Sequence, residues 1–273
     1  MQCKKGLSVT WGTLLLSLLS LGIFIIPATG GTLYQVATID ALLDGVYQGS
    51  VSIQELTLRG TAGIGTFHAL DGEMILSQGI CYRAAVTGEV SPVPQEETTP
   101  FASVASWTEE EEQRYPLSGV DSLEDLEHQV AEKITNINVP WLVLVKGSFE
   151  HLRYRSVPPQ EEPYPPLAEA AKEQRFFTSE NIPGELVGFW APSYVEGINV
   201  PGFHLHFLSE DRTRGGHLTE CTAGELELVL VPLYEYTISL PASEAFRQAD
   251  LRKNRSEALS EVERPEAPAE ITE

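Results

Sequence analysis

Residues 202–207 of the chain read Gly202-Phe203-His204-Leu205-His206-Phe207, and Gly215-Gly216-His217 follows after a polar segment. Side chains alternate between the two faces of an extended strand. His204 and His206 therefore share one face, and the apolar residues beside them point into the opposite layer. Residues 209–216 are rich in Asp, Arg and Gly, which is typical of a hairpin connection. We expect this hairpin to bring His217 beside the first pair.

Three neutral imidazoles on one face form a candidate metal site. Histidine nitrogens suit zinc, and they also suit other first-row divalent ions such as iron, nickel or manganese. Three protein ligands leave room for a substrate at the metal. A plainer interpretation is that H-x-H marks two half-exposed polar residues opposite a hydrophobic face. The third histidine at hairpin distance and the strongly apolar opposite face favour the metal site.

Length and charge restrict the function further. The chain has 273 residues, enough for one large domain or two modest ones. Its formal charge is −21, from 39 acidic and 18 basic residues. This charge argues against nucleic acid or an anionic membrane surface as a partner. An anionic substrate would need a local arginine to oppose the field of the whole protein.

Residues 1–30 resemble an export signal. Two lysines precede an apolar run, and residues 6–39 carry no charge. Ala28 and Gly30 form an A-x-G cleavage site. The alternative is an uncleaved membrane anchor through residues 6–28, because the uncharged segment is nearly long enough to span a bilayer. We therefore expect an exported protein, periplasmic or extracellular, or a membrane-anchored one.

Two cysteines, Cys81 and Cys221, remain after such a cleavage, and both stand in apolar, strand-like contexts. Two cysteines can form one disulfide in an exported protein. Two buried thiols are the interpretation that we favour.

A cluster of prolines divides the rest of the chain. Residues 158–167 contain five prolines, which exclude a helix and favour a linker. Residues 31–160 then form an N-terminal domain. Several short strands in residues 161–243 favour an antiparallel β domain, barrel-like or curved, which carries the metal site. Residues 244–273 form a charged tail with a helix-prone first part.

Local patterns predict the individual elements. Asp71-Gly72 indicates a hairpin turn, with a strand beginning at Glu73 and continuing to Arg83. Helices are predicted at residues 38–43 and 121–134, and further strands at residues 51–58, 63–68, 141–146, 149–157, 184–190, 203–208, 218–222, 225–231 and 235–240.

A set of longer motifs spans nearly all of the chain after residue 30. They are Leu58-Arg59-Gly60, Gly65-Thr66, Leu70-Asp71-Gly72-Glu73-Met74, Thr99-Pro100-Phe101, Arg155-Ser156-Val157-Pro158, Pro163-Tyr164-Pro165, Asn199-Val200-Pro201-Gly202-Phe203-His204-Leu205-His206-Phe207 and Gly215-Gly216-His217. With these motifs the chain resembles the acetolactate decarboxylases, metal-dependent enzymes that convert 2-acetolactate to acetoin and carbon dioxide. The resemblance implies a two-domain α/β fold, in which a mixed sheet precedes a smaller antiparallel β domain. It also implies a homodimer.

The resemblance assigns roles to residues at the site. It implies that the three histidines bind a catalytic zinc ion. The glutamate of L-D-G-E-M corresponds to Glu73, the arginine of R-x-V-P to Arg155 and the threonine of G-T to Thr66.

A glutamate near the carboxyl end also reaches the metal site in this family. The tail of this chain offers Glu261 and Glu263. The spacing from Asp250-Leu251 favours Glu263.

The decarboxylation of 2-acetolactate requires groups of these kinds. A divalent metal chelated by the ketone and hydroxyl oxygens would stabilise the enediolate formed as carbon dioxide leaves, so no organic cofactor is needed. Arg155 is expected to hold an anionic oxygen as a forked donor. The enediolate must then be protonated at carbon, and Glu73 or Glu263 is the natural acid. Thr66 is expected to donate a hydrogen bond to the substrate.

Two alternative functions fit parts of the pattern. A cupin metal motif also begins with H-x-H and a following glutamate, here Glu210, but it places its third histidine in a more distant motif. A non-catalytic exported zinc-binding protein would close the coordination sphere of the metal. The sequence contains no G-x-S-x-G elbow, phosphate-binding glycine loop or H-E-x-x-H motif. We therefore expect a metal-dependent acetolactate decarboxylase.

Overall fold

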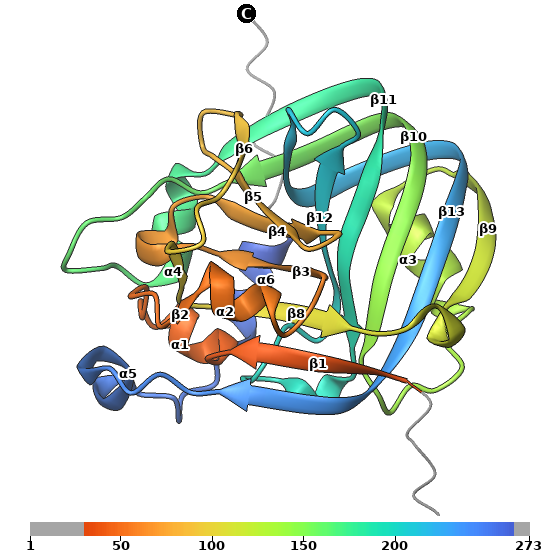
Figure 1. Ribbon diagram of the computed structural model, residues 1–273. Helices are drawn as coiled ribbons and strands as arrows, with labels where there is room; N and C mark the ends of the chain where they lie inside the picture. Colours follow the sequence, from red (N-terminus) through yellow and green to blue (C-terminus); the bar gives the residue numbers. More distant parts are fainter. Residues whose placement is uncertain (1–29, 265–273) are drawn as a thin grey trace, which may run out of the picture.

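One large mixed sheet dominates the computed structural model of the protein, which describes residues 30–264 (Figure 1). The strands are β1 (Gly31–Val36), β2 (Val51–Ser52), β3 (Ala62–Thr66), β4 (Glu73–Ser77), β5 (Ile80–Ala84), β6 (Val90–Pro92), β7 (Thr98–Thr99), β8 (Ala102–Ser106), β9 (Gln113–Val120), β10 (Trp141–Ser156), β11 (Arg175–Ala191), β12 (Gly202–Ser209) and β13 (Gly215–Ser239). The helices are few and short: α1 (Ile39–Leu43), α2 (Ile53–Thr57), α3 (Leu123–Ala131), α4 (Leu167–Ala170), α5 (Glu244–Gln248) and α6 (Ser256–Glu263). The protein therefore has the mixed α/β fold that was expected.

Strand β13 connects the parts of the sheet. Its beginning lies between β12 and β10, its middle pairs with β9 and β10, and its end runs parallel to β1. Since β10 also pairs with β11, and β11 with β12, strands β10 to β13 form a closed circuit of hydrogen-bonded neighbours. The remaining strands continue from β1 in the order β8-β3-β4-β5-β6.

The domain boundary expected near residue 160 falls inside this hydrogen-bonded arrangement. β10 precedes the boundary, and its two partners β11 and β13 follow it. The division into residues 31–160 and 161–243 stays a prediction, and the strand pairing crosses it. The expected export signal lies almost entirely outside the described residues, as does the end of the tail. Within residues 30–264 no helix has the length and apolar character needed to cross a membrane.

One predicted strand, at residues 51–58, is largely wrong. Only Val51–Ser52 is extended, and helix α2 follows it. The side chain of Ser52 accepts a hydrogen bond from the backbone N–H of Glu55 at 3.2 Å and so caps this helix. Ser52 and Glu55 have the S-x-x-E spacing that marks a helix start.

Other strand boundaries differ because bent strands were interpreted as separate ones. The predicted pair at residues 141–146 and 149–157 is the single strand β10, which bends at Gly147 with a φ of +157°. The three strands predicted between residues 218 and 240 are likewise the single strand β13. Conversely, the strand predicted from Glu73 to Arg83 is the hairpin of β4 and β5. The short helix at α1, the hairpin turn before Glu73 and the helix at α3 are confirmed.

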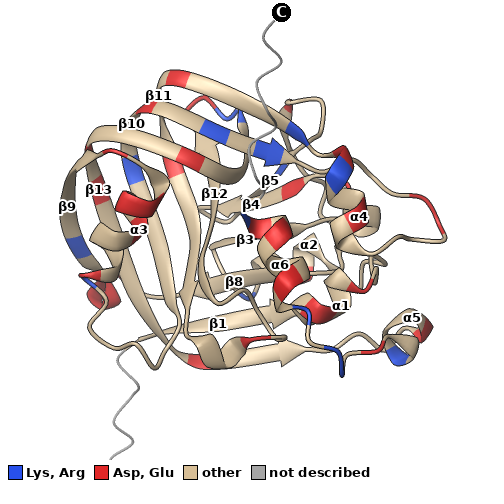
Figure 2. Cartoon of the chain, turned by 180° about the vertical axis from the view of Figure 1, so that it is seen from behind, with Lys and Arg blue, Asp and Glu red and all other residues tan. Residues whose placement is uncertain are grey.

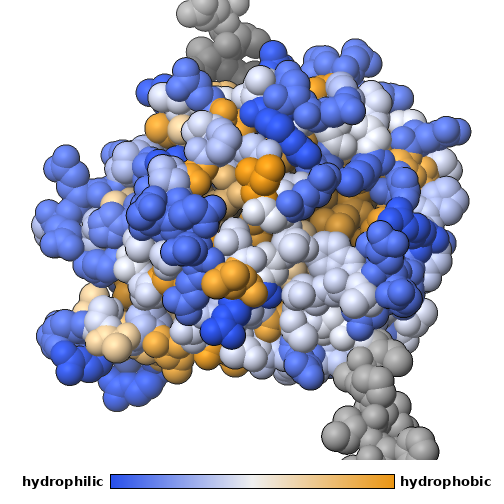
Figure 3. All heavy atoms as spheres, viewed as in Figure 1, coloured by the Kyte–Doolittle hydropathy of each residue, from blue (hydrophilic) through white to orange (hydrophobic). Residues whose placement is uncertain are grey.

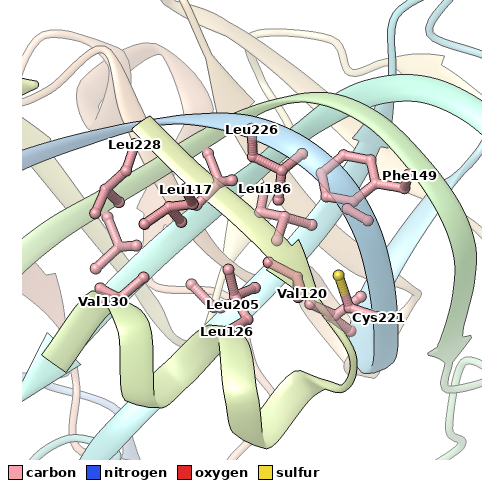
Figure 4. Packing of buried hydrophobic residues seen from close by; sticks show 14 of the residues in the cluster. Leu117, Val120, Leu126, Val130, Phe149, Leu186, Leu205, Cys221, Leu226 and Leu228 are labelled. Atoms are coloured by element: carbon pink, nitrogen blue, oxygen red, sulfur yellow. The ribbon is translucent and has the colours of Figure 1, made fainter. Parts of the chain in front are cut away.

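Helix α3 shows how the helices are attached to the sheet. Its apolar residues Leu126 and Val130 are fully buried and point toward the strands (Figure 4). Burial of one such side chain contributes about 1.5–3 kcal/mol. Ser122 begins the helix by accepting from the N–H of Asp125 at 3.0 Å.

A second group of helices covers the end of the sheet that carries the histidines. Figure 2 shows α6 beside α1, behind the strands of Figure 1. Ile39 and Leu42 from α1, Leu167 from α4, and Leu259 and Val262 from α6 belong to one buried cluster. Part of this cluster lines the cavity that contains the histidines.

The outer surface is largely polar. On the face shown in Figure 3, apolar residues lie in small areas among hydrophilic ones. Glu109 and Glu110 of the acidic run are exposed, as expected for solvated charges.

Both cysteines in the described part of the chain are free thiols. Cys81 and Cys221 are buried in different apolar clusters, so no disulfide links them. Burial raises the pKa of each thiol to about 12. The interpretation as buried thiols is confirmed.

Candidate active site and metal centre

The register of β12 and β13 brings the three histidines together. His204 and His206 lie on the same face of β12, and His206 stands directly opposite His217 of β13. Their candidate ligand nitrogens all lie within 4.8 Å of one another. The predicted hairpin between residues 209 and 216 therefore has the expected result.

The histidines are in the state that a metal requires. Burial, together with the positive charge of Arg155, lowers the pKa of His204 to about 3, and burial lowers the pKa of His206 and His217 well below the usual value. All three imidazoles are therefore neutral at physiological pH. Nδ1 of His206 donates to the carbonyl oxygen of Met74 at 2.9 Å, which leaves Nε2 to face Nε2 of His204 at 3.2 Å. A backbone partner of this kind commonly fixes the tautomer of a metal-binding histidine.

Arg155 lies next to the histidines because β10 pairs with β13. It stands opposite His217 and is 3% exposed. Its Nη1 donates to Oε1 of Glu73 at 2.9 Å, and its Nη2 donates to the carbonyl oxygen of Val262 at 3.0 Å. Nε is buried and has no acceptor within residues 30–264. The N–H of Nε is therefore available to a ligand.

The close packing of β10 on β13 depends on Gly216. Its φ is +153°, and a Cβ at this position would lie 2.5 Å from the carbonyl oxygen of Arg155. A larger residue would push the two strands apart at the site.

Two carboxyl groups lie close to the histidines, one on β4 and one on α6. Glu73 is the first residue of β4, and its Oε2 lies 3.8 Å from Nε2 of His206. Glu263 is the last residue of α6, and its Oε2 lies 3.7 Å from Nε2 of His204 and 3.8 Å from Nε2 of His217. This oxygen is buried and has no hydrogen-bond partner among the residues that the structure describes. Of the two tail glutamates, Glu261 is exposed, so the structure brings only Glu263 to the cluster.

Burial makes both carboxyls weak acids. It raises the pKa of Glu73 to about 7 and that of Glu263 to about 7, and the charge of Arg155 opposes both shifts. Near neutral pH each carboxyl therefore exchanges a proton readily. A cation bound to the histidines would favour the ionised form of both.

Thr66 lines the cavity that contains the histidines. Its hydrogen bond differs from the one expected. Its hydroxyl donates to the carbonyl oxygen of Gly72 at 2.8 Å, within the turn that leads to Glu73. A threonine has a single hydroxyl proton. In this arrangement the Thr66 hydroxyl can accept a hydrogen bond from a ligand, but its proton is already donated to Gly72. Contact of Thr66 with the substrate stays a prediction.

The sequence patterns did not indicate the rest of the cavity wall. It is apolar and consists of Ile39, Leu42, Leu70, Phe101, Val157 and Leu167, with Gly65 and Val262. Leu70, Phe101 and Val157 stand inside the quoted motifs, which could have indicated them. Those on α1 and α4 have no local signal that separates them from ordinary core residues. Glu210, the glutamate of the cupin alternative, is exposed and lies outside this cavity.

Comparison with known proteins identifies the family. Residues 33–253 match the family model for alpha-acetolactate decarboxylase. The alpha-acetolactate decarboxylase of Methanosarcina mazei is 42% identical over 232 residues, which cover 85% of this chain and 80% of that protein. That of Brevibacillus brevis is 37% identical over 237 residues, which cover 87% of this chain and 82% of that protein.

A solved structure extends the likeness to the fold. The crystal structure of alpha-acetolactate decarboxylase from Bacillus subtilis strain 168 superposes with a TM-score of 0.81 at 33% identity, covering 85% of this chain and 98% of that chain. Fold and sequence thus define the same class of protein. The chain belongs to the alpha-acetolactate decarboxylase family.

Proposed function

We propose that the protein decarboxylates 2-acetolactate to acetoin and carbon dioxide. The observation that carries the proposal is one cavity in which three neutral histidines, an arginine and two carboxyls with raised pKa values converge. Membership of the alpha-acetolactate decarboxylase family supports the choice of substrate.

The proposed cofactor is zinc or another first-row divalent ion. His204, His206 and His217 would hold it, because they are neutral and close enough for their nitrogens to share one ion. The buried Oε2 of Glu263, which has no partner within residues 30–264, fits a neighbouring cation as well. When bound, the ion supplies a Lewis acid for the ketone and hydroxyl oxygens of the substrate.

Arg155 is proposed to bind the anionic end of the substrate. Its Nε is the buried donor left over after Glu73 and Val262 have taken the two terminal nitrogens. An unpaired buried donor costs about 1–3 kcal/mol. A carboxylate placed at Nε would remove this cost, and the local positive charge would offset the acidity of the whole chain.

The two glutamates are proposed to handle the proton. As the bond between carbon 2 and the carboxylate breaks, its electron pair moves toward the ketone oxygen and an enediolate remains. A proton must then be added to carbon 2 to give acetoin. Glu73 and Glu263 are the acids closest to the histidines, and the apolar wall keeps bulk water from competing with them.

The location and assembly of the enzyme are part of the same proposal. The charge pattern of residues 1–30 supports export or a membrane tether through residues 6–28. The family resemblance supports a homodimer.

Acetoin release from racemic 2-acetolactate by the purified chain without residues 1–30 tests the proposal. We expect turnover that a chelator abolishes and added zinc restores. A protein that holds zinc and releases no acetoin would support the alternative of a non-catalytic zinc-binding protein.

A further inference from the structure

Glu263 reaches the histidines from a helix that the family match does not include. The match ends at residue 253, and α6 begins at Ser256. A helix of eight residues is about 12 Å long at 1.5 Å per residue. The start of α6 therefore lies away from the histidine cluster. The contacts of this first turn can influence the position of the whole helix.

The start of α6 is fixed by Arg255. Its Nη2 donates to Oδ1 of Asp44, the C-cap residue that follows α1. The side chain of Arg255 is 9% exposed and that of Asp44 is 27% exposed, so this ion pair is partly buried. Oδ2 of Asp44 also accepts from the backbone N–H of Asp250 at 3.2 Å. Asp44 thus holds both ends of the connection between α5 and α6.

A second acidic residue binds the chain segment on either side of Arg255. Glu196 accepts from the hydroxyl of Ser256 and, at 3.4 Å, from Nδ2 of Asn254. Asn254, Arg255 and Ser256 are consecutive, so the segment just before and at the start of α6 is bound at two points.

The anchoring helix α1 is itself part of the active-site wall. Ile39 and Leu42 of α1 line the cavity that contains Glu263. The pair formed by Arg255 and Asp44 therefore joins α6, which carries the carboxyl of Glu263, to α1, which forms part of the cavity wall.

The contacts at the other end of α6 are of two kinds. The carbonyl oxygen of Val262 accepts from Arg155 inside the site. Beyond the helix, Arg264 donates to Glu127 of α3 at 2.7 Å, but Arg264 is 66% exposed. Exposed ion pairs contribute little because water screens them. Of the two ion pairs outside the cavity, the one formed by Arg255 is therefore the stronger anchor.

We infer that Arg255 is a positioning residue, whose pairing with Asp44 sets the position of α6 and so places the Glu263 carboxyl at the histidine cluster. The inference rests on the proposed function, in which Glu263 takes part in decarboxylation. Misplacement of a reacting group by about 1 Å can cost 10²-fold in rate.

A double-mutant cycle tests whether Arg255 acts through Glu263. Arg255→Gln should lower kcat about 10- to 100-fold and change KM less than about threefold. In a Glu263→Gln background the same substitution should change kcat less than about twofold, because the group that it positions is already gone. Arg255→Lys should recover part of the rate. Arg247→Gln is the matched control, since Arg247 forms an exposed pair with Glu244 within α5.

Hydrogen exchange of residues 256–264 gives a second measurement that needs no turnover. Exchange should accelerate in Arg255→Gln and stay unchanged in Arg247→Gln. An equal loss of kcat in both backgrounds would show a general structural role and overturn the inference, as would unchanged kcat and exchange. If Arg255→Gln does not fold, Asp44→Asn replaces it in the cycle. Absence of acetoin from the unmodified enzyme would refute the proposed function alone, because the exchange result would still decide whether Arg255 holds α6.

Discussion

Replacement of Glu73 by glutamine should stop turnover and leave the metal in place. Glutamine has nearly the same volume, and its carbonyl oxygen can still accept the 2.9 Å hydrogen bond from Nη1 of Arg155. It cannot deliver an acidic proton. Oε2 of Glu73 lies 3.8 Å from His206, and three histidine nitrogens remain to hold the ion.

The size of the loss follows from the second carboxyl. A positioned general acid contributes about 10²- to 10⁴-fold, or about 3–5 kcal/mol of the activation barrier. Glu263 approaches the other two histidines, His204 at 3.7 Å and His217 at 3.8 Å, and the pKa of its carboxyl is also raised to about 7. It can therefore supply part of the proton transfer in the variant. We expect a fall in kcat near the lower end of the range, about 10²-fold.

The assay measures kcat from acetoin release and zinc content by elemental analysis on the same sample. Glu261→Gln is the control, because Glu261 is an exposed glutamate on α6. A kcat within about threefold of the unmodified enzyme, at full zinc content, would refute the acid role of Glu73. Loss of zinc together with activity would instead show that Glu73 is required to bind the metal.

Three further predictions concern the metal, the thiols and the backbone. His206→Ala should lose bound zinc and activity together, measured by elemental analysis and acetoin release, while alanine at the exposed His128 should retain both. Because burial raises the pKa of Cys81 and Cys221 to about 12, mass spectrometry should find neither alkylated at pH 8 until the protein is denatured, and labelling of the native protein would contradict their burial. Gly216→Ala should lower the free energy of unfolding by about 1–3 kcal/mol in urea titrations, since its Cβ would meet a backbone carbonyl of β10 at 2.5 Å, and unchanged stability would show that the strands can separate without cost.

The histidine cluster could be predicted from the sequence because its geometry is local. Strand alternation places His204 and His206 on one face, and a short hairpin returns His217 to them. Arg155 and Glu73 have no such local signal, and their prediction depended on motifs shared with a family. Their meeting in space, 82 residues apart in the chain, results from the packing of β4 against the histidine-bearing strands.

The position of α6 and the closure of the sheet could not be predicted. Periodicity indicates a helix-prone tail, but the contact of Arg255 with Asp44 joins residues 211 positions apart. The same is true of β10, whose pairing with β11 and β13 crosses the expected domain boundary. Contacts of this kind depend on tertiary packing, which local pattern does not encode.

The parallel pairing of β1 with the end of β13 also affects the order of folding. Residues 31–36 pair on one edge with residues 102–106 and on the other with residues 233–239. Contacts between residues so far apart carry a high loop-closure entropy and slow the folding reaction. During synthesis the first strand therefore keeps one edge unpaired until nearly the whole chain has left the ribosome.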